Sequence, residues 1–475
     1  MHPPMLKGTT YSNVQSRRSS LIRISTSVIA TALVFPSFAD TFTWDGAGGS
    51  GNRLWSNALN WDSNVAPNND GTDDLFFAGS VKLNPRANGG WDINSMNFSV
   101  GAGAFVFSGL TSDEILLEGG VGLGGVGVLN SSANLQTINQ QISLGASQTF
   151  SAAGAGLLFG GNVNLGSFQL TLSSSGANNI TLGNIVSGPG SLSKTGTGSL
   201  TLSGANSYSA GTTLSAGTLT LAADTAAGSG SVALNGGTLQ ASGTRTIANN
   251  IVLGSGSIGG SDNLTLSGVV SGSSSLAKNG SGTLRLGSAN SASGSVAINA
   301  GTLALGANGA LGSVSSVTIA SGAALTLDSG GGNLVNDSAG LTFAGGTLNA
   351  NNHDENFGAL NLTGSSILNL LDDATDADLT FASFGTLTGG AVLTISGWAG
   401  GVNLSLTPGG TADRVFFSTT VPQEKLNSIF FAGNPGGQGA WQMPSGEIIP
   451  VPEPSTWALL GASLAVIPFM RRKRA

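Results

Sequence analysis

The sequence predicts an all-β protein built as a right-handed parallel β-helix or a similar β-solenoid. Glycine makes up 75 of the 475 residues, and short segments such as Leu219–Leu221 and Leu284–Leu286 alternate strictly between leucine and small polar or charged residues. Gly-Ser/Thr-Leu elements recur at steps that fit turns of about 19 to 23 residues. Alternation with period two indicates strands, and glycine supplies the tight corners between them. Stacked rungs would then bury the leucine face of each neighbour.

The glycine content alone would also fit a disordered chain, but the rest of the composition does not. Hydrophobic residues make up 40% of the sequence and charged residues only 9%. Disordered segments usually show the opposite balance, because they cannot bury enough apolar surface to offset the entropy of folding. We therefore expect the chain to fold.

A long repeat supports the solenoid and carries the first family resemblance. The segment Leu192–Leu202 returns as Leu276–Leu286, and Ala216–Leu219 returns as Ala300–Leu303 with the same spacing. Together with Gly190–Tyr208, this pattern resembles the autotransporter-associated β-strand repeat. The second copy keeps the lysine, glycines and asparagine of the first but has lost its tyrosine: Lys278, Gly280, Gly282 and Asn290. The resemblance implies a surface-exposed, passenger-like solenoid and implies no catalytic residues.

The N-terminus has the layout of a secretory signal peptide. Arg17, Arg18 and Arg23 precede an apolar stretch over 24–35, and small residues follow at the positions that favour cleavage after Ala39. We expect the general secretion route, because Ser20 stands where twin-arginine export would favour a large apolar residue.

The C-terminus predicts a short membrane anchor followed by a basic stop. The stretch Trp457–Met470 has no charge and would form a helix about 21 Å long, against about 30 Å of bilayer hydrocarbon. Pro468 weakens it further. The predicted anchor residues are Trp457, Leu459, Leu460, Leu464, Val466, Ile467 and Phe469, and the basic stop is Arg471, Arg472, Lys473 and Arg474. Positive residues favour the cytoplasmic side, which leaves the body of the chain outside.

A proline-rich motif, Pro452, Glu453 and Pro454, comes just before this anchor. Because each proline restricts its predecessor to extended backbone, Glu453 should be accessible to a protease. Motif, apolar run and basic cluster in this order resemble the PEP-CTERM sorting signal. That family implies recognition and cleavage by an exosortase-type membrane protease, in bacteria that make extracellular polysaccharide. A simple tail anchor is the alternative interpretation.

These observations predict five segments. They are a signal peptide at 1–39, an N-terminal cap at 40–100, β-solenoid repeats at 101–350, a C-terminal β region at 351–449 and the sorting signal at 450–475. Trp44, Trp55, Trp61 and Trp91 concentrate in the cap, where large aromatic residues would close the exposed end of the solenoid. Stacking of these tryptophans on sugar rings is the alternative.

Charge argues against several functions. Eight of the 17 basic residues lie in the two terminal signals, which leaves nine against 24 acidic residues, so nucleic acid is not an expected partner. The repeats carry isolated charges: Asp224, Asp262, Asp328, Asp337, Lys194, Arg245, Lys278 and Arg285. Polysaccharide-cleaving β-helices need clustered carboxylates, so we expect no enzyme and no cofactor. The acidic runs at 68–74 and 372–378, and His353–Glu355, are expected to be turns or loops rather than calcium sites.

The sequence therefore predicts an exported, non-catalytic β-solenoid that is tethered briefly to the inner membrane. After cleavage it would reside at the cell surface, in the outer envelope or outside the cell, with extracellular polysaccharide as a partner. Two alternatives are a carbohydrate-active β-helix enzyme and an adhesin-like autotransporter passenger. The passenger would need a C-terminal membrane barrel, for which the roughly 100 residues between Ala350 and the anchor are too few.

Overall fold

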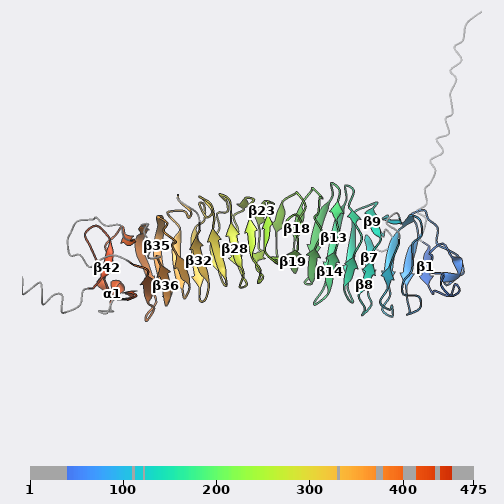
Figure 1. Ribbon diagram of the computed structural model, residues 1–475, viewed down its shortest axis with the longest axis horizontal. Helices are drawn as coiled ribbons and strands as arrows, with labels where there is room; N and C mark the ends of the chain where they lie inside the picture. The colour runs from blue at the N-terminus through green and yellow to red at the C-terminus, as the bar shows by residue number, and fades with distance from the viewer. Residues whose placement is uncertain are drawn as a thin grey trace, which may run out of the picture. The chain divides into compact units, whose positions relative to one another are not determined.

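A computed structural model describes residues 40–109, 113–120, 124–328, 332–370, 378–398, 413–433 and 439–451. This part of the chain forms a parallel β-solenoid of about 14 turns with almost no helix, which confirms the predicted fold class (Figure 1). Every strand pairing among its four large sheets is parallel, and each strand except those at the ends of a sheet pairs with the strand one turn earlier and one turn later.

Two long sheets run through most of the solenoid. The first sheet contains β1 (Thr41–Trp44), β2 (Asp74–Phe77), β4 (Ser95–Phe98), β7 (Val126–Asn130), β10 (Gln148–Ala152), β13 (Gln169–Ser174), β16 (Ser191–Thr195), β18 (Thr212–Leu214), β20 (Val232–Leu234), β23 (Ile251–Leu253) and β26 (Val270–Ser271). The second sheet contains β5 (Val106–Phe107), β8 (Gln136–Ile138), β11 (Leu157–Phe159), β14 (Asn179–Leu182), β17 (Ser199–Leu202), β19 (Thr218–Leu221), β21 (Thr238–Ala241), β24 (Ser257–Ile258), β27 (Leu276–Lys278), β29 (Val296–Ile298), β31 (Ser316–Ala320), β33 (Gly340–Ala344), β35 (Glu355–Gly364), β37 (Asp378–Leu387) and β39 (Arg414–Phe417).

Two further sheets close the coil in different parts of the chain. The third sheet, in the N-terminal part, contains β3 (Trp91–Ile93), β6 (Glu114–Leu117), β9 (Gln141–Leu144), β12 (Val163–Asn164) and β15 (Val186–Ser187). The fourth sheet contains β22 (Arg245–Ile247), β25 (Leu264–Leu266), β28 (Thr283–Leu286), β30 (Thr302–Leu305), β32 (Ala324–Leu327), β34 (Thr347–Asn349), β36 (Ser366–Asn369), β38 (Leu393–Ser396) and β40 (Ile429–Phe431). The remaining elements are a 3-10 turn, Ala58–Asn60, the short helix α1 (Gln423–Leu426) and a hairpin of β41 (Ala440–Gln442) and β42 (Ile448–Pro450).

The alternating pattern of the sequence becomes an inside and an outside of the coil. In β19 the two leucines are buried, while Thr218 and Thr220 point outward. Leu219 pairs with Leu200 of the rung before and with Leu239 of the rung after, so the leucines form a continuous column. Full burial of one such side chain contributes about 1.5–3 kcal/mol before entropy is subtracted. The column explains why the rungs are stable only when stacked.

Glycine is required at the corners by both conformation and space. Gly217 has a φ of +73°, in the left-handed region that other residues rarely adopt. A Cβ atom at this position would also lie 2.1 Å from the carbonyl oxygen of Gly198 in the rung below. Gly217 therefore forms a tight corner of the coil, as the sequence predicted for the glycines.

The two copies of the long repeat occupy different faces of the solenoid. The first copy runs through β16 and β17, in the first and second sheets. Its counterpart runs through β27 and β28, in the second and fourth sheets. The repeat is therefore longer than a whole number of turns, and the second copy is displaced by one face around the coil.

Antiparallel segments cover both ends of the parallel stack. At the N-terminal end Trp44 in β1 bridges Trp61, and at the C-terminal end Phe416 in β39 bridges Glu447. A reversal of chain direction prevents a further rung from adding in the same register, which protects the exposed edge strands. The predicted cap at 40–100 also contributes β1, β2 and β4 to the first sheet, so the coil begins within it.

Candidate functional sites

The predicted processing residues lie outside the described residues. This holds for Ala39, for the sorting motif Pro452–Pro454, and for the anchor and basic stop at 457–474. The described chain ends just before the motif: Pro450 closes β42, and the Val451 N–H donates to the Gly439 carbonyl at 3.5 Å. The sorting signal thus follows directly from the open end of the C-terminal hairpin. Within the described residues no helix is long and apolar enough to cross a membrane.

The cap tryptophans are packed inside the solenoid, as predicted. Trp44, Trp55 and Trp61 are at most 1% exposed, and Trp91 is 6% exposed. Their rings meet edge to face, with centroids 5.3 Å apart for Trp44 and Trp61 and 5.5 Å apart for Trp55 and Trp91. Aromatic pairs favour this geometry, and it leaves no face open for stacking on a sugar.

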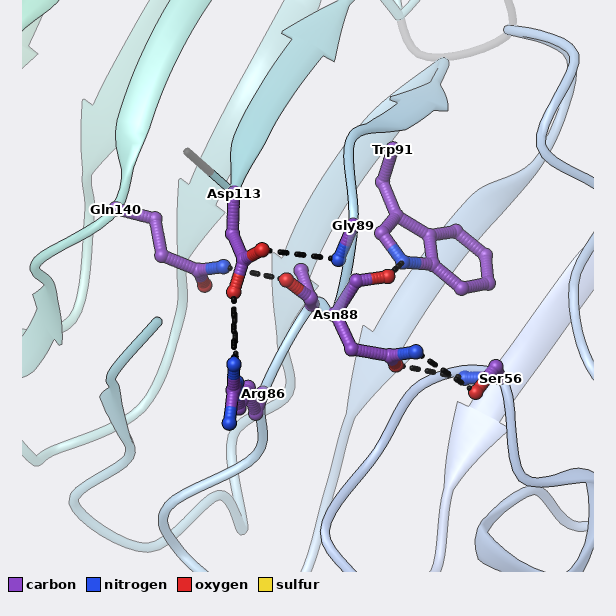
Figure 2. Close-up of polar contacts among 8 residues, drawn as sticks. Ser56, Arg86, Asn88, Gly89, Trp91, Asp113 and Gln140 are labelled. Atoms are coloured by element: carbon purple, nitrogen blue, oxygen red, sulfur yellow. Dashed lines mark hydrogen bonds and ion pairs between the residues drawn. The ribbon is translucent and has the colours of Figure 1, made fainter. Parts of the chain in front are cut away.

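A polar network holds the loop before β3 in place (Figure 2). The buried Asp113 carboxylate accepts the Gly89 N–H at 3.0 Å and pairs with the Arg86 guanidinium at 3.4 Å. Within the same loop the Trp91 indole N–H donates to the Asn88 carbonyl at 3.1 Å. These contacts fix the orientation of Trp91 and of the strand that it begins.

Side chains from two neighbouring turns reinforce this loop. The Asn88 amide donates to the Ser56 hydroxyl at 3.0 Å, and the Gln140 amide donates to the Ala87 carbonyl at 2.9 Å (Figure 2). Ser56 and Gln140 are far apart in sequence, so the network joins separate turns of the coil. It gives β3 and β6 a rigid support.

An open cleft of about 360 Å³ lies on the outer face of this support. Asp92 in β3 and Glu114 and Leu116 in β6 point outward on paired strands. The cleft is lined by Asn69, Gly90, Trp91, Asp92, Glu114 and Leu116. We call it the Asp92 cleft.

The two carboxylates of the Asp92 cleft have different surroundings. Partial burial raises the pKa of Asp92, and the charges of Glu118 and Asp70 raise it further. Its Oδ1 atom has no hydrogen-bond partner within the described residues. Glu114 instead accepts hydrogen bonds from the Gln141 amide at 3.1 Å and from the Ser143 hydroxyl. The burial of Asp92 and the acidic charges beside it thus favour its neutral form.

The acidic run at 68–74 is a loop as far as Asp73, as predicted, but Asp73 and Asp74 are buried and Asp74 is the first residue of β2. Asp70 accepts the Thr72 N–H at 3.2 Å and its hydroxyl at 2.7 Å, and Asp73 accepts the Asn68 N–H. Within the described ranges, no group of three or more His, Asp or Glu side chains is arranged to hold a metal ion. Of the run at 372–378, only Asp378 is described, and it pairs with Arg414 at 2.6 Å.

The loop expected at His353–Glu355 is confirmed only in part. His353 closes a turn through Asn351 and Asn352, which both have positive φ. Glu355 is instead the first residue of β35, and its buried carboxylate accepts the Leu334 N–H at 2.7 Å. Burial raises the pKa of Glu355 to about 7.

The prediction that the charges of the repeats are isolated is wrong for Arg285 and Asp328. Arg285 in β28 forms an ion pair at 3.0 Å with Asp328, which follows β32 two turns later. Lys194 and Lys278 have their side chains inside the coil, with exposures of 0% and 2%. Charged residues that are far apart in sequence can be in contact on neighbouring rungs, so their spacing along the chain does not show whether they are paired.

Each buried lysine is enclosed by carbonyl groups at a corner. The Lys194 ammonium donates to the Gly196 carbonyl at 2.8 Å. The Lys278 ammonium donates to the Gly280 carbonyl at 2.8 Å and to the Ala300 carbonyl of the next rung at 3.0 Å. Burial lowers the pKa of Lys194 to about 8 and lowers that of Lys278. Carbonyl oxygens replace water around the ammonium and tie the corner of one rung to its own strand or to the next rung.

Sequence reasoning missed the Asp92 cleft because its residues come from separate turns. Asp92 and Glu114 are 22 residues apart, close to one turn of the coil, and both occupy outward positions of alternating segments. A search for acidic residues at turn-length spacing could have found the pair. The contribution of Asn69 comes from a loop and has no such signal.

Two family models match the chain. The passenger-associated-transport-repeat model matches residues 192–221, 216–241 and 276–305, so the repeat predicted from sequence is confirmed. The PEP-CTERM protein-sorting motif matches residues 450–474. No curated protein and no solved structure gives a significant match. The motif implies export, a transient membrane anchor, processing by an exosortase-type membrane protease, and release to the cell surface or outside. The chain is therefore an exported β-solenoid protein with passenger-associated-transport repeats and a PEP-CTERM sorting motif.

Proposed function

We propose that the released solenoid is a non-catalytic structural protein that associates with extracellular polysaccharide at the cell surface or in the surrounding matrix. In this proposal residues 1–39 are the signal peptide and Trp457–Met470 the temporary membrane helix. Both are discarded, so the mature protein begins at Asp40 and ends near Glu453. The work of the protein then belongs to the coil between them.

The outward face of the repeats supports this role. Thr181, Thr201 and Thr220 occupy the same outward position on successive strands of the second sheet and form a column of hydroxyl groups. Hydroxyl groups donate and accept hydrogen bonds, as the hydroxyls of a sugar do. A regular surface of this kind can bind a repeating polymer through many weak contacts, whose combined strength far exceeds that of one contact.

The experiment is co-sedimentation of the mature protein, purified from the medium of producing cells, with the polysaccharide of the same cells. We expect the protein to pellet with the polymer and the polymer chain length to remain unchanged. A protein that stays in the supernatant at every polymer concentration would contradict the association. New reducing ends or shortened chains would contradict the non-catalytic role.

The Asp92 cleft favours a second candidate function, cleavage of a glycosidic bond. A carboxyl group with a raised pKa can protonate a leaving oxygen, while an ionised carboxylate nearby stabilises developing positive charge. Asp92, which lines the cleft, would take the first role, and Glu118, which lies outside the lining but whose charge acts on Asp92, would take the second. The cleft is open to a polymer. We rank this function second because partial burial beside other acidic residues also raises the pKa of a strand carboxylate that has no catalytic role.

The substitution Asp92→Asn separates the two functions. If the cleft is catalytic, this variant loses the release of reducing ends while it still binds the polymer. If the protein is non-catalytic, wild type and variant both release none. Ser143→Ala, which alters only a hydroxyl that donates to Glu114, is the matched control for local structure.

A further inference from the structure

One tryptophan in the described chain differs from the others. Trp441 in β41 is 50% exposed, whereas the cap tryptophans are nearly fully buried. An indole ring left half in water gives up about half of the stabilisation that its burial would supply, which is about 1.5–3 kcal/mol for a large apolar side chain. A single exposed apolar residue is common on a protein surface, but an exposed aromatic ring in the wall of a pocket is a candidate contact for a ligand.

Trp441 forms one wall of a pocket of about 400 Å³ at the C-terminal end of the solenoid. The other walls are the segment after β39 and the turn of the hairpin: Phe417, Ser418, Thr419, Thr420, Gln442, Met443, Pro444, Ser445 and Gly446. None of these residues is charged. Within the described residues, the hydroxyls of Ser418 and Thr420 have no hydrogen-bond partner and are exposed to solvent.

The Gln442 side-chain amide braces the pocket, in addition to the backbone contacts between the hairpin and β39. The Gln442 side chain accepts the Val421 N–H at 2.8 Å and donates to the Thr419 carbonyl at 3.0 Å and to the Phe417 carbonyl at 3.3 Å. It therefore ties the hairpin to the segment that follows β39. This brace keeps the indole of Trp441 and the hydroxyl groups at a fixed separation before any ligand arrives, which lowers the entropy cost of binding.

We propose that the Trp441 pocket binds an uncharged sugar ring of a polysaccharide. One face of a pyranose ring carries C–H groups and is apolar, so it can lie against an indole, while the hydroxyls at the rim of the ring meet polar groups. The absence of charge in the lining favours a neutral sugar over a uronic acid or a phosphate, which would lose hydration without gaining a counter-charge. This inference rests on the proposed association with polysaccharide and names the site that carries it.

None of the residues that line this pocket belongs to the sorting signal. Val451 lies beside Gly439 at the open end of the hairpin, and the chain continues from there into the sorting signal. The lining residues of the hairpin run from Trp441, one pair in from the open end, to the turn that Gly446 closes by donating to Met443. Removal of the tail therefore leaves the pocket walls intact in the mature protein.

The test is binding of the mature protein, purified from the medium, to three polymers: the polysaccharide of the producing cells, a soluble neutral glucan and a soluble polyuronate. Trp441→Ala is the main variant and Trp441→Phe keeps an aromatic platform. Leu135→Ala is the matched control, because Leu135 is also 50% exposed and lies far away in the chain. Circular dichroism establishes that all variants keep the solenoid.

We expect Trp441→Ala to weaken binding to the cells' own polysaccharide and to the glucan about tenfold, Trp441→Phe to weaken it less, and Leu135→Ala to leave it unchanged. Equal binding by wild type and Trp441→Ala would overturn the site and leave the proposed function standing. Tighter binding to the polyuronate than to the glucan would overturn the choice of a neutral sugar. No binding by wild type to any polymer would reject the proposed function, and this inference with it.

Discussion

The two repeat copies at 192–221 and 276–305 are identical at about half of their positions but lie on different faces of the coil. Lys194 stands at a corner between the first and second sheets, and Lys278 at a corner between the second and fourth. Their ammonium groups nevertheless donate to the carbonyl two residues on at the same distance, 2.8 Å. The strand–corner–strand unit thus keeps the same local structure on two different faces of the coil.

The copies differ where the first has a tyrosine. The Tyr208 hydroxyl is buried and hydrogen-bonds the Thr212 hydroxyl. In the second copy the corresponding residues are Ala292 and Val296, so both members of the pair are absent and no buried hydroxyl is left without a partner. The lost volume appears as a cavity of about 10 Å³ beside Ala292. Variants of these residues test whether the two copies have the same local stability.

The largest effect is expected from Tyr208→Ala. This change empties a fully buried site and should cost about 3–5 kcal/mol of local stability, because the surrounding rungs can collapse only in part. Since solenoid stability is a sum over neighbouring turns, the loss should appear as faster amide hydrogen exchange in the rungs around 191–234. Unchanged exchange there would contradict the packing described. Exchange across 276–305 serves as the internal control.

A smaller loss, equal in both copies, is expected from Asn206→Ala and Asn290→Ala. Asn206 accepts the Val186 N–H at 2.7 Å and donates to the Ala226 carbonyl at 2.6 Å. Asn290 makes the same two bonds, at 2.7 and 2.9 Å. Each variant should lose about 1–3 kcal/mol of local stability, because buried backbone groups are left without partners.

Urea titration followed by hydrogen exchange measures both losses. Asn299→Ala, at an exposed position, is the control and should stay within about 0.5 kcal/mol. A loss in only one copy would show that the two units are not equivalent.

The buried lysines predict a dependence of stability on alkaline pH. Their pKa is lowered in the folded state, to about 8 for Lys194, so the unfolded chain binds more protons above that pH. Stability should therefore rise as pH increases from about 8 towards the ordinary lysine value near 10.4. Thermal unfolding across this range is the measurement. Lys194→Met with Lys278→Met should flatten the rise, and a fall in wild-type stability over the same window would contradict the assignment.

The smallest effect is expected from Ala292→Val. The added methyl groups extend towards the cavity in the second copy and should raise local stability by less than about 1 kcal/mol. Hydrogen exchange across 276–305 would detect it. Slower exchange supports the view that the cavity marks the missing tyrosine, and marked destabilisation would show that the site cannot accept volume.

Periodicity predicted the fold because each rung repeats the same local pattern. The alternation in Leu219–Leu221 indicated a strand with one buried face, and Gly217 indicated a corner, and both occur as expected. The change of face between the two repeat copies could not be predicted, since it depends on how many corners the chain makes between them. The fate of a lysine such as Lys194, inside rather than outside, depends in the same way on the register of its strand.

The candidate sites were less predictable than the fold. The sorting motif is local in sequence, so it could be recognised directly and matches its family model. Asp92 and Glu114 are brought together by one turn of the coil, and Trp441 meets Thr420 only because the hairpin folds back onto β39. Contacts of this kind depend on the three-dimensional path of the chain, so they are difficult to predict from the sequence.

The most direct test of the central claim, that this solenoid is exported and released from a discarded tail, is the intact mass of the protein recovered from the cell surface and medium. Cells with the processing protease should yield a product that begins at Asp40 and ends within Pro452–Pro454, and cells without it should retain a chain that ends at Ala475. A surface product that still ends at Ala475 in cells with the protease would contradict the account.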